Sequence, residues 1–227
     1  QKNPTFTERF GFFPGQFIGN PALDPESSTS YEIGVDRTFR GRDLSISATV
    51  FHQDLEDEIN GFVFDPVTFL STAENIDGDS ERSGVELGAT WRVSEQLDLG
   101  ASYTYADASE QDPAGIDVAE LRRPRHSGNL SMSVRSADER WRSHLSANYG
   151  STRKDQFFPP FPQPPEIVTL GNYWLVDLAV QYQLTDAVTV FARGANLLDE
   201  NYEQVYGYQT PGRTGYLGIR ANFGTAN

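Results

Sequence analysis

Alternation of apolar and polar residues with a period of two runs along nearly the whole chain. In 84–93, for example, apolar residues from Val85 to Val93 alternate with Glu86, Gly88, Thr90 and Arg92. Successive side chains of a β-strand point to opposite faces, so this period predicts strands with one apolar and one polar face. A helical period of 3.6 is missing, apart from room for one turn in 116–122. Nine strands are expected, at 30–39, 44–53, 84–93, 97–106, 130–134, 141–149, 174–182, 188–192 and 217–223.

The connections between these segments alternate in length. Short turns are expected at 41–43, 94–96, 136–139 and 185–187, and long links at about 54–75, 107–122, 150–170 and 199–213. One end of the sheet would therefore carry tight turns and the other long loops. Loops of that length are normally functional. The same asymmetry is typical of outer-membrane barrels, with short periplasmic turns and long extracellular loops.

Two features favour a membrane barrel over a soluble β-sandwich, which also alternates. The middle of the apolar register is filled by small residues, whereas a sandwich core would need bulkier ones to reach native packing density. Large aromatics end the strands on the same register and form two belts, as at the two interfaces of a bilayer. The belts are Phe39, Trp91, Trp141, Tyr182 and Phe223 at the short-turn end, and Tyr31, Tyr103, Tyr105, Tyr149 and Trp174 at the long-loop end.

Charge and cysteine content exclude several classes of function. The 227 residues include 32 acidic and 18 basic side chains, a net charge of −14, which argues against a nucleic-acid partner. Without cysteine there are no disulfides or thiolate metal sites. Charged residues occupy the polar register, as a lumen would require, and we expect ion pairs among Arg92, Arg193, Arg220, Glu86, Asp98 and Asp177, with Glu32, Asp36 and Arg135 on the same face.

Nine is an awkward strand count, because bacterial barrels close with even numbers. Residues 1–27 are rich in Pro, Gly and Phe and begin without methionine or an export signal. We therefore interpret 1–27 as an extracellular loop, 28–223 as nine strands and 224–227 as a tail. The chain is then expected to be the C-terminal portion of a larger antiparallel transmembrane β-barrel. A 22-stranded transporter barrel would need on the order of 550 residues.

Several local motifs follow one another along the chain. They are Asn3-Pro4-Thr5-Phe6-Thr7-Glu8, Gly19-Asn20-Pro21-Ala22-Leu23-Asp24-Pro25-Glu26, Ser30-Tyr31-Glu32-Ile33-Gly34, Ser83-Gly84-Val85-Glu86, Arg122-Arg123-Pro124-Arg125-His126, Asn196-Leu197-Leu198-Asp199 followed by Tyr202, and Tyr206–Arg213. In their order and spacing these motifs resemble TonB-dependent outer-membrane receptors. Within that family, Tyr206–Arg213 and the final strand look closest to cobalamin-transporter-like members.

The resemblance implies a Gram-negative outer-membrane receptor. Such a receptor imports a scarce large nutrient, such as a ferric siderophore or cobalamin, with energy from an inner-membrane TonB complex. Its partners would be outer-membrane lipid, its own plug domain, which would lie upstream of this chain, and the barrel-assembly machinery. The final strand resembles the signal that this machinery reads, at Tyr216, Gly218 and Phe223, although the family usually ends at the aromatic residue.

Aromatic residues in two long loops are the candidates for ligand contact. Phe157, Phe158 and Phe161 stand among stiff prolines in 150–170, and Tyr206 and Tyr208 lie in the next loop. Exposed aromatics would suit a large, partly apolar ligand. The alternative is a self-packed loop that caps the barrel mouth.

The sequence gives no reason to expect catalysis, a cofactor or a metal. His144 shares the polar face with Ser146 and Asn148, but the pattern places no acidic residue to orient it. The acidic residues at 54–58 and Asp77-Gly78-Asp79 lack the closing glutamate of a calcium loop and are read as solvated. Two alternatives remain open: a small self-closing outer-membrane barrel acting as a passive pore or hydrolase, and a soluble β-sandwich binding module.

Overall fold

The computed structural model of the chain describes all residues except 13–14, 66, 68, 77, 79, 112–115, 161 and 224–227. The chain forms two compact units, which we describe separately. The loop unit consists of Gln1–Ile33, Phe51–Gly84 and Asp107–Glu120, and the sheet unit of Gly34–Val50, Val85–Ala106 and Leu121–Asn227.

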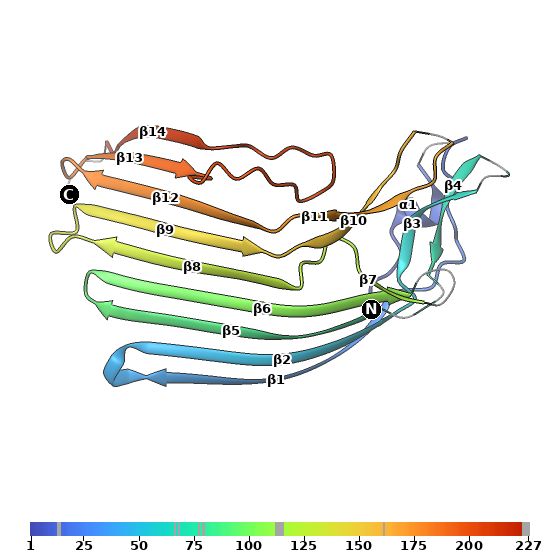
Figure 1. Ribbon diagram of the computed structural model, residues 1–227, viewed down its shortest axis with the longest axis horizontal. Helices are drawn as coiled ribbons and strands as arrows, with labels where there is room; N and C mark the ends of the chain where they lie inside the picture. The colour runs from blue at the N-terminus through green and yellow to red at the C-terminus, as the bar shows by residue number, and fades with distance from the viewer. Residues whose placement is uncertain are drawn as a thin grey trace. The chain divides into compact units, whose positions relative to one another are not determined.

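Nine long strands form an antiparallel meander, as the alternation predicted, and they lie side by side in the order β1-β2-β5-β6-β8-β9-β12-β13-β14 (Figure 1). β1 and β14 stand at the two ends of this path, so the sheet is not closed into a barrel. The strands are β1 (Ser27–Phe39), β2 (Leu44–Glu56), β5 (Ser80–Ser94), β6 (Leu97–Gln111), β8 (His126–Arg135), β9 (Trp141–Gly150), β12 (Tyr173–Gln183), β13 (Val188–Ala195) and β14 (Thr214–Ala221).

The strand register separates apolar from polar residues into alternate rows across the sheet. Directly paired residues project to the same face, so a row of pairs shows what that face presents. One row runs through Ala101, Leu130, Ala147 and Val176, and the next runs through Gly100, Ser131, Ser146 and Asp177. The sheet therefore has one apolar and one polar face, as expected.

The aromatic belts are built from paired residues at the strand ends. The rings of Trp141 and Tyr182 lie 6.2 Å apart at the short-turn end of β9 and β12. At the other end of the same two strands, the rings of Tyr149 and Trp174 lie 4.9 Å apart. Apolar side chains between and beside the belts are exposed, with Leu130 at 54% and Leu217 at 89% of full exposure. A sheet face this apolar and this exposed requires an apolar surrounding.

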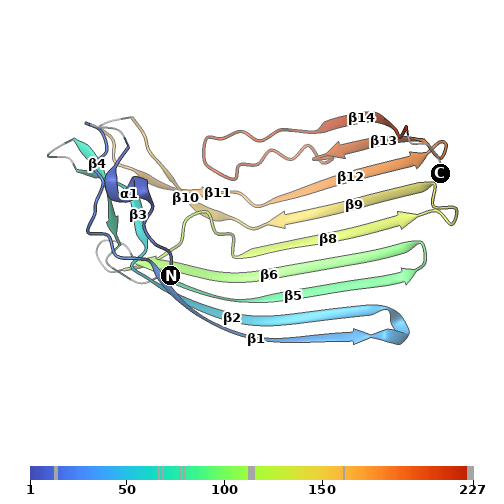
Figure 2. The ribbon, with the colours of Figure 1, turned by 180° about the vertical axis from the view of Figure 1, so that it is seen from behind.

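The short connections of the nine-strand sheet lie at one end of its strands. The view from behind shows the β1–β2, β5–β6, β8–β9 and β12–β13 turns together at that end (Figure 2). The β1–β2 turn contains the 3-10 helix η1 (Arg40–Arg42), followed by Asp43 in the left-handed region at φ 46°. In the β8–β9 turn, the Ser136 hydroxyl donates to the Asp138 carboxylate and accepts from the Trp141 backbone amide.

The long links contain regular structure that the period-two pattern did not predict. The link at 150–170 holds the hairpin β10 (Arg153–Phe157) and β11 (Glu166–Leu170), and the link at 54–75 holds β3 (Ile59–Asp65) and β4 (Leu70–Asn75). The segment 116–122, which had room for one helical turn, does not form a helix. The segment instead forms β7 (Asp117–Ala119), which pairs with the extended end of β6.

Residues 1–27, expected as a loop, begin with the short helix α1 (Phe6–Phe10). The Thr5 side chain accepts from the Glu8 backbone amide, and the Glu8 carboxylate accepts from the Thr5 amide at 2.6 Å. This reciprocal capping box satisfies two amides at the helix start and explains the Thr5-Phe6-Thr7-Glu8 motif. Among the described residues, no helix is long and apolar enough to cross a membrane.

The loop unit has a small apolar core. Phe17, Leu23 and Ala73 are at most 5% exposed, and Ile59 packs against them. Backbone hydrogen bonds join residues 16–18 to Ser71 of β4, each at 2.8 Å. The N-terminal segment is therefore fixed to the β3–β4 hairpin by both apolar packing and backbone pairing.

Candidate functional site

Two elements of the sheet unit, the β10–β11 hairpin and the loop 196–213, carry the predicted ligand-contact aromatics. The rings of Phe157 and Tyr206 lie 5.0 Å apart, tilted by 56°. Phe158 and Tyr208 are 67% and 72% exposed. Phe161 lies outside the described residues. The structure thus brings together one residue from each predicted group and leaves one further ring of each group exposed. We call these four residues the aromatic site.

The loop 196–213 is closed at its base by the Asn-Leu-Leu-Asp motif. Asn196 is buried and left-handed (φ 49°), and its side chain donates to the carbonyls of Glu200 at 2.9 Å and Pro211 at 3.3 Å. Its backbone amide donates to Asp177 of β12 at 2.8 Å. Across the loop, the Arg213 amide donates to Asp199 at 2.8 Å. The motif therefore closes the base of the loop through hydrogen bonds, which is a structural role rather than ligand binding.

Asp155 of β10 lies two residues before Phe157 and is fully buried. Its Oδ1 accepts from Nε of Arg122 at 2.7 Å and from the backbone amide of Gln156 at 2.8 Å. Its Oδ2 accepts from the backbone amide of Tyr206 at 2.7 Å. Three separate segments of the chain therefore meet at one carboxylate.

The hydrogen bonds at Asp155 keep its carboxylate ionised. Burial by itself would raise the pKa of this carboxyl, because desolvation penalises the charged form. The hydrogen bonds from the Tyr206 amide, the Arg122 side chain and the Gln156 amide outweigh burial and hold the pKa below its ordinary value. A buried, ionised and fully bonded carboxylate is a fixed point from which neighbouring segments are positioned.

Arg153 is two residues before Asp155 on the same face of β10 and is also buried. Its guanidinium donates to the Glu203 carbonyl and lies over the Tyr173 ring, 5.1 Å from the centroid. Tyr173 in turn contacts Tyr202, with ring centroids 4.7 Å apart. Arg153 therefore holds the 202–203 segment, just before Tyr206.

The sequence interpretation did not single out Asp155 or Arg153, and it noted Arg122 only as part of a basic strand entry. Charged residues at i and i+2 of a short strand are usually solvated, so their spacing carries no sign of burial. Their partners lie 33 and about 50 residues away in the chain, at Arg122, Glu203 and Tyr206. Only the folded arrangement brings these groups together.

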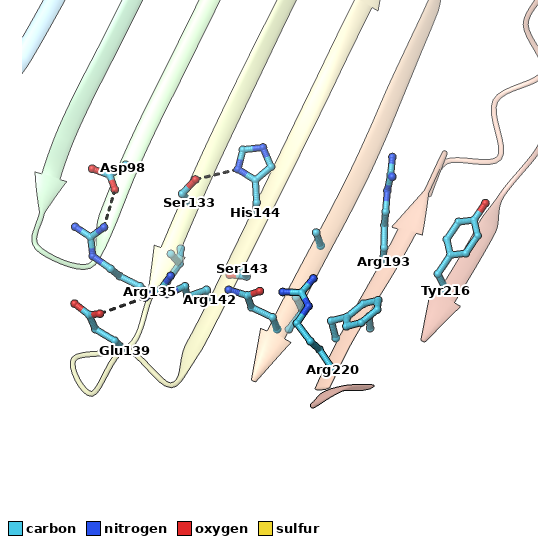
Figure 3. A pocket seen from close by; sticks show the side chains of 16 residues that line it. Asp98, Ser133, Arg135, Glu139, Arg142, Ser143, His144, Arg193, Tyr216 and Arg220 are labelled. Atoms are coloured by element: carbon cyan, nitrogen blue, oxygen red, sulfur yellow. Dashed lines mark hydrogen bonds and ion pairs between the residues drawn. The ribbon is translucent and has the colours of Figure 1, made fainter. Parts of the chain in front are cut away.

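The polar face of the sheet has a groove of about 760 Å³ near the short turns (Figure 3). Arginines from β8, β9, β13 and β14 line it, and Figure 3 shows Arg135 directed at Asp98 and Arg142 at Glu139. The ion pairs Arg92–Asp98 at 3.2 Å and Arg193–Asp177 at 3.8 Å form as expected. The groove lining includes Asp98, Arg135, Glu139, Arg142, Arg193, Tyr216 and Arg220.

Neither catalytic nor metal chemistry is indicated by this groove. Nδ1 of His144 lies 2.9 Å from the Ser133 hydroxyl. In the described part of the chain, no three His, Asp or Glu residues are placed to hold a metal ion. Of the acidic residues considered for calcium, Asp77 and Asp79 lie outside the described residues.

The residues of the expected assembly signal lie in and after β14, at one end of the sheet path. Tyr216 and Phe223 are 57% and 98% exposed. Gly218 pairs with Phe191 of β13, and a Cβ at this glycine would come within 2.3 Å of the Phe191 ring. A side chain at 218 would therefore require the Phe191 ring to shift.

Comparison with known proteins agrees with this architecture. The family model described as TonB dependent receptor-like, beta-barrel, matches residues 1–197. The iron-regulated outer membrane virulence protein of Vibrio cholerae is 29% identical over 92% of this chain and 33% of its own length. The chain thus spans about a third of that curated relative.

Solved structures show the same fold. The pyoverdine outer membrane receptor FpvA of Pseudomonas aeruginosa gives a TM-score of 0.72 at 20% identity, covering 97% of this chain and 32% of the receptor. The copper transporter OprC gives 0.71 at 17% identity, covering 98% and 36%.

These matches confirm the class of protein and the cellular location that the sequence predicted. The family and its matched members are receptors and transporters of the Gram-negative outer membrane, not enzymes. The similarity of the last strands to cobalamin-transporter-like members stays a prediction. The chain belongs to the TonB-dependent receptor family, as part of its β-barrel.

Proposed function

We propose that the receptor containing this chain binds a scarce large nutrient, a ferric siderophore or cobalamin, and imports it with inner-membrane energy. The observation that carries this proposal is the Phe157–Tyr206 contact, flanked by the exposed rings of Phe158 and Tyr208. Relatives named as ferripyoverdine and ferric enterobactin receptors support the siderophore class. On this view the aromatic site takes part in ligand capture at the extracellular surface.

The chemistry of the aromatic site fits such a ligand. Aromatic rings offer large apolar surfaces with little conformational entropy to lose, and a bulky chelate presents both apolar and polar groups. Rings on two different elements can contact opposite sides of one ligand. The exposed rings supply contact area, and the Phe157–Tyr206 pair supplies a fixed base.

The proposal extends to partners that this chain does not contain. The arginine-lined groove on the polar face would meet the plug domain, and the plug would couple to the TonB complex. Bilayer lipid would cover the apolar face, and β14 with Phe223 would be read by the barrel-assembly machinery. The domain assignment is part of the same proposal: 1–27 extracellular, 28–223 the nine strands with their links, and 224–227 a tail.

Ligand binding to the full-length receptor tests the proposal. Purified receptor in detergent would be titrated with ferripyoverdine, ferric enterobactin and cobalamin, and uptake would be measured in a receptor-deficient strain. We expect tight binding of one probe, and weaker binding after Phe158→Ala and Tyr208→Ala. Ile167→Ala, at a similarly exposed apolar residue of β11, is the matched control. Unchanged affinity in both aromatic variants would contradict the proposal.

Energy dependence separates import from a passive pore. We expect uptake by the full receptor to stop when the inner-membrane proton gradient is collapsed. The chain by itself, without a plug, is expected to restore no energy-dependent uptake. Uptake that continues unchanged without the gradient would favour the alternative of a passive pore.

A further inference from the structure

We infer that Asp155 is a positioning residue that holds the tip of loop 196–213 against the β10–β11 hairpin, so that the aromatic site is formed before a ligand arrives. Arg122 and Arg153 act with it. The inference rests on the proposed function, because it gives Asp155 and these two arginines a role in ligand capture.

The two oxygens of the Asp155 carboxylate accept hydrogen bonds from different segments of the chain. Oδ2 accepts only from the backbone amide of Tyr206, at 2.7 Å, in the hydrogen bonds that the structure gives it. Oδ1 accepts from Arg122 and Gln156. Oδ2 thus binds the loop tip. Oδ1 binds the segment before β8, through Arg122, and β10 itself, through the Gln156 amide. A neutral amide at 155 would have a single accepting oxygen and could not serve both sides.

The loop tip is held at two points, one just before its turn and one within it. Arg153 donates to the Glu203 carbonyl, and Asp155 accepts from Tyr206 three residues later. The chain reverses over 205–208: the Tyr208 amide donates to the Val205 carbonyl at 3.1 Å, and Gly207 is left-handed at φ 79°. Two buried charges from one face of β10 therefore set where this turn lies.

Closure of loop 196–213 at its base does not depend on Asp155. The base of the loop is already closed by Asn196 and Asp199, which do not contact Asp155 in any hydrogen bond or ion pair given by the structure. Asp155 is therefore not needed to form the loop, only to place its tip. A loop ordered beforehand loses less conformational entropy on binding, which raises affinity. An ion pair with one buried and one half-exposed partner is weak grounds for a stability role, which makes a role in specific placement the better explanation.

The test uses Asp155→Asn in the full-length receptor. Hydrogen exchange of the 202–210 segment, measured without ligand, is expected to become faster. Affinity for the probe that binds the unmodified receptor is expected to fall by about three- to tenfold. Lys154→Gln is the matched control, because Lys154 is the exposed neighbour in β10 and its Nζ contacts Thr169, so neither measurement should change.

Arg122→Gln guards against misfolding of the first variant. The Arg122 side chain is half exposed, and its loss leaves the Asp155–Tyr206 bond in place. We expect a smaller increase in exchange of the 202–210 segment than with Asp155→Asn, with the folded barrel retained on unheated electrophoresis. Unchanged exchange in both variants would overturn the inference whatever the ligand.

A double-mutant cycle distinguishes positioning from general destabilisation. If Asp155 acts by placing the rings of Tyr206 and Tyr208, then Asp155→Asn should weaken binding in the unmodified receptor but add little in a background that carries both Tyr206→Ala and Tyr208→Ala. Additive losses would overturn the inference and leave the proposed function intact. Unchanged binding in Tyr206→Ala and Phe157→Ala would instead remove both the role of these rings and the inference built on it.

Discussion

The loop unit and the nine-strand sheet treat their apolar residues in opposite ways. In the loop unit, Phe17, Leu23 and Ala73 are buried in a small core. In the sheet, apolar side chains such as Leu130 and Leu217 are exposed. The difference teaches that alternation in this chain marks strands with one exposed apolar face, whereas the segments of the loop unit bury their apolar residues in a core of their own.

Breaking the loop-unit core should have the largest effect. Phe17→Ala is expected to cost about 3–5 kcal/mol of the local free energy of unfolding, because it leaves a cavity among well-packed groups. Hydrogen exchange of the β3 and β4 segments measures this cost. Phe6→Ala, at a 76% exposed ring of α1, is the control and should change little. Equal effects of the two changes would show that the core is not what orders this unit.

A charge on the apolar face of the sheet should come next. Leu130→Arg is expected to cost about 2–4 kcal/mol, the cost of a basic residue near the middle of a bilayer. Ile167→Arg is the matched change, because Ile167 is 60% exposed on β11 and faces water in our account. Urea unfolding of the full receptor in phospholipid vesicles compares them. Similar costs at both positions would break the distinction between lipid-facing and water-facing apolar residues.

The sheet could be predicted from the sequence, whereas the contacts within the long links could not. The nine strands, their faces and the aromatic belts depend on period-two alternation, which is local and visible in residues such as Val85 to Val93. The β10–β11 hairpin has no such alternation, because Arg153 and Asp155 occupy its buried face. The Phe157–Tyr206 contact joins residues 49 apart that were predicted as two separate sets. Long-range contacts of this kind leave no local pattern.

Acid should release the tip of loop 196–213 before it affects the sheet. The pKa of Asp155 lies below its ordinary value, so its stabilising effect is fully present above the unfolded value of about 3.9 and is lost as pH falls through the folded pKa. Charged hydrogen bonds of this kind contribute about 1.5–3 kcal/mol. Proteolysis by pepsin across acidic pH would locate the release. Cleavage of the loop in Asp155→Asn should occur already at the upper end of that range.

Exposed ion pairs on the polar face should matter least. Glu139→Gln removes the 3.2 Å pair with Arg142, whose two side chains are more than half exposed, and should cost no more than about 1 kcal/mol. Glu120→Gln should cost more, because its 2.8 Å pair with Arg82 in the loop unit is largely buried. Urea unfolding measures the first change and local hydrogen exchange the second. The reverse order would mean that burial does not set the strength of these pairs.

Spin labels along β8 test the central claim most directly, which is that the alternating faces of this sheet meet lipid and lumen. The chain has no cysteine, so single cysteines can be placed in it at 129–133 within the full receptor in vesicles. We predict that labels at Leu130 and Met132 collide mainly with oxygen, which concentrates in lipid. Labels at Asn129, Ser131 and Ser133 should collide less with oxygen. Equal oxygen accessibility at all five positions, or high accessibility of Leu130 and Met132 to a water-soluble nickel chelate, would contradict the account.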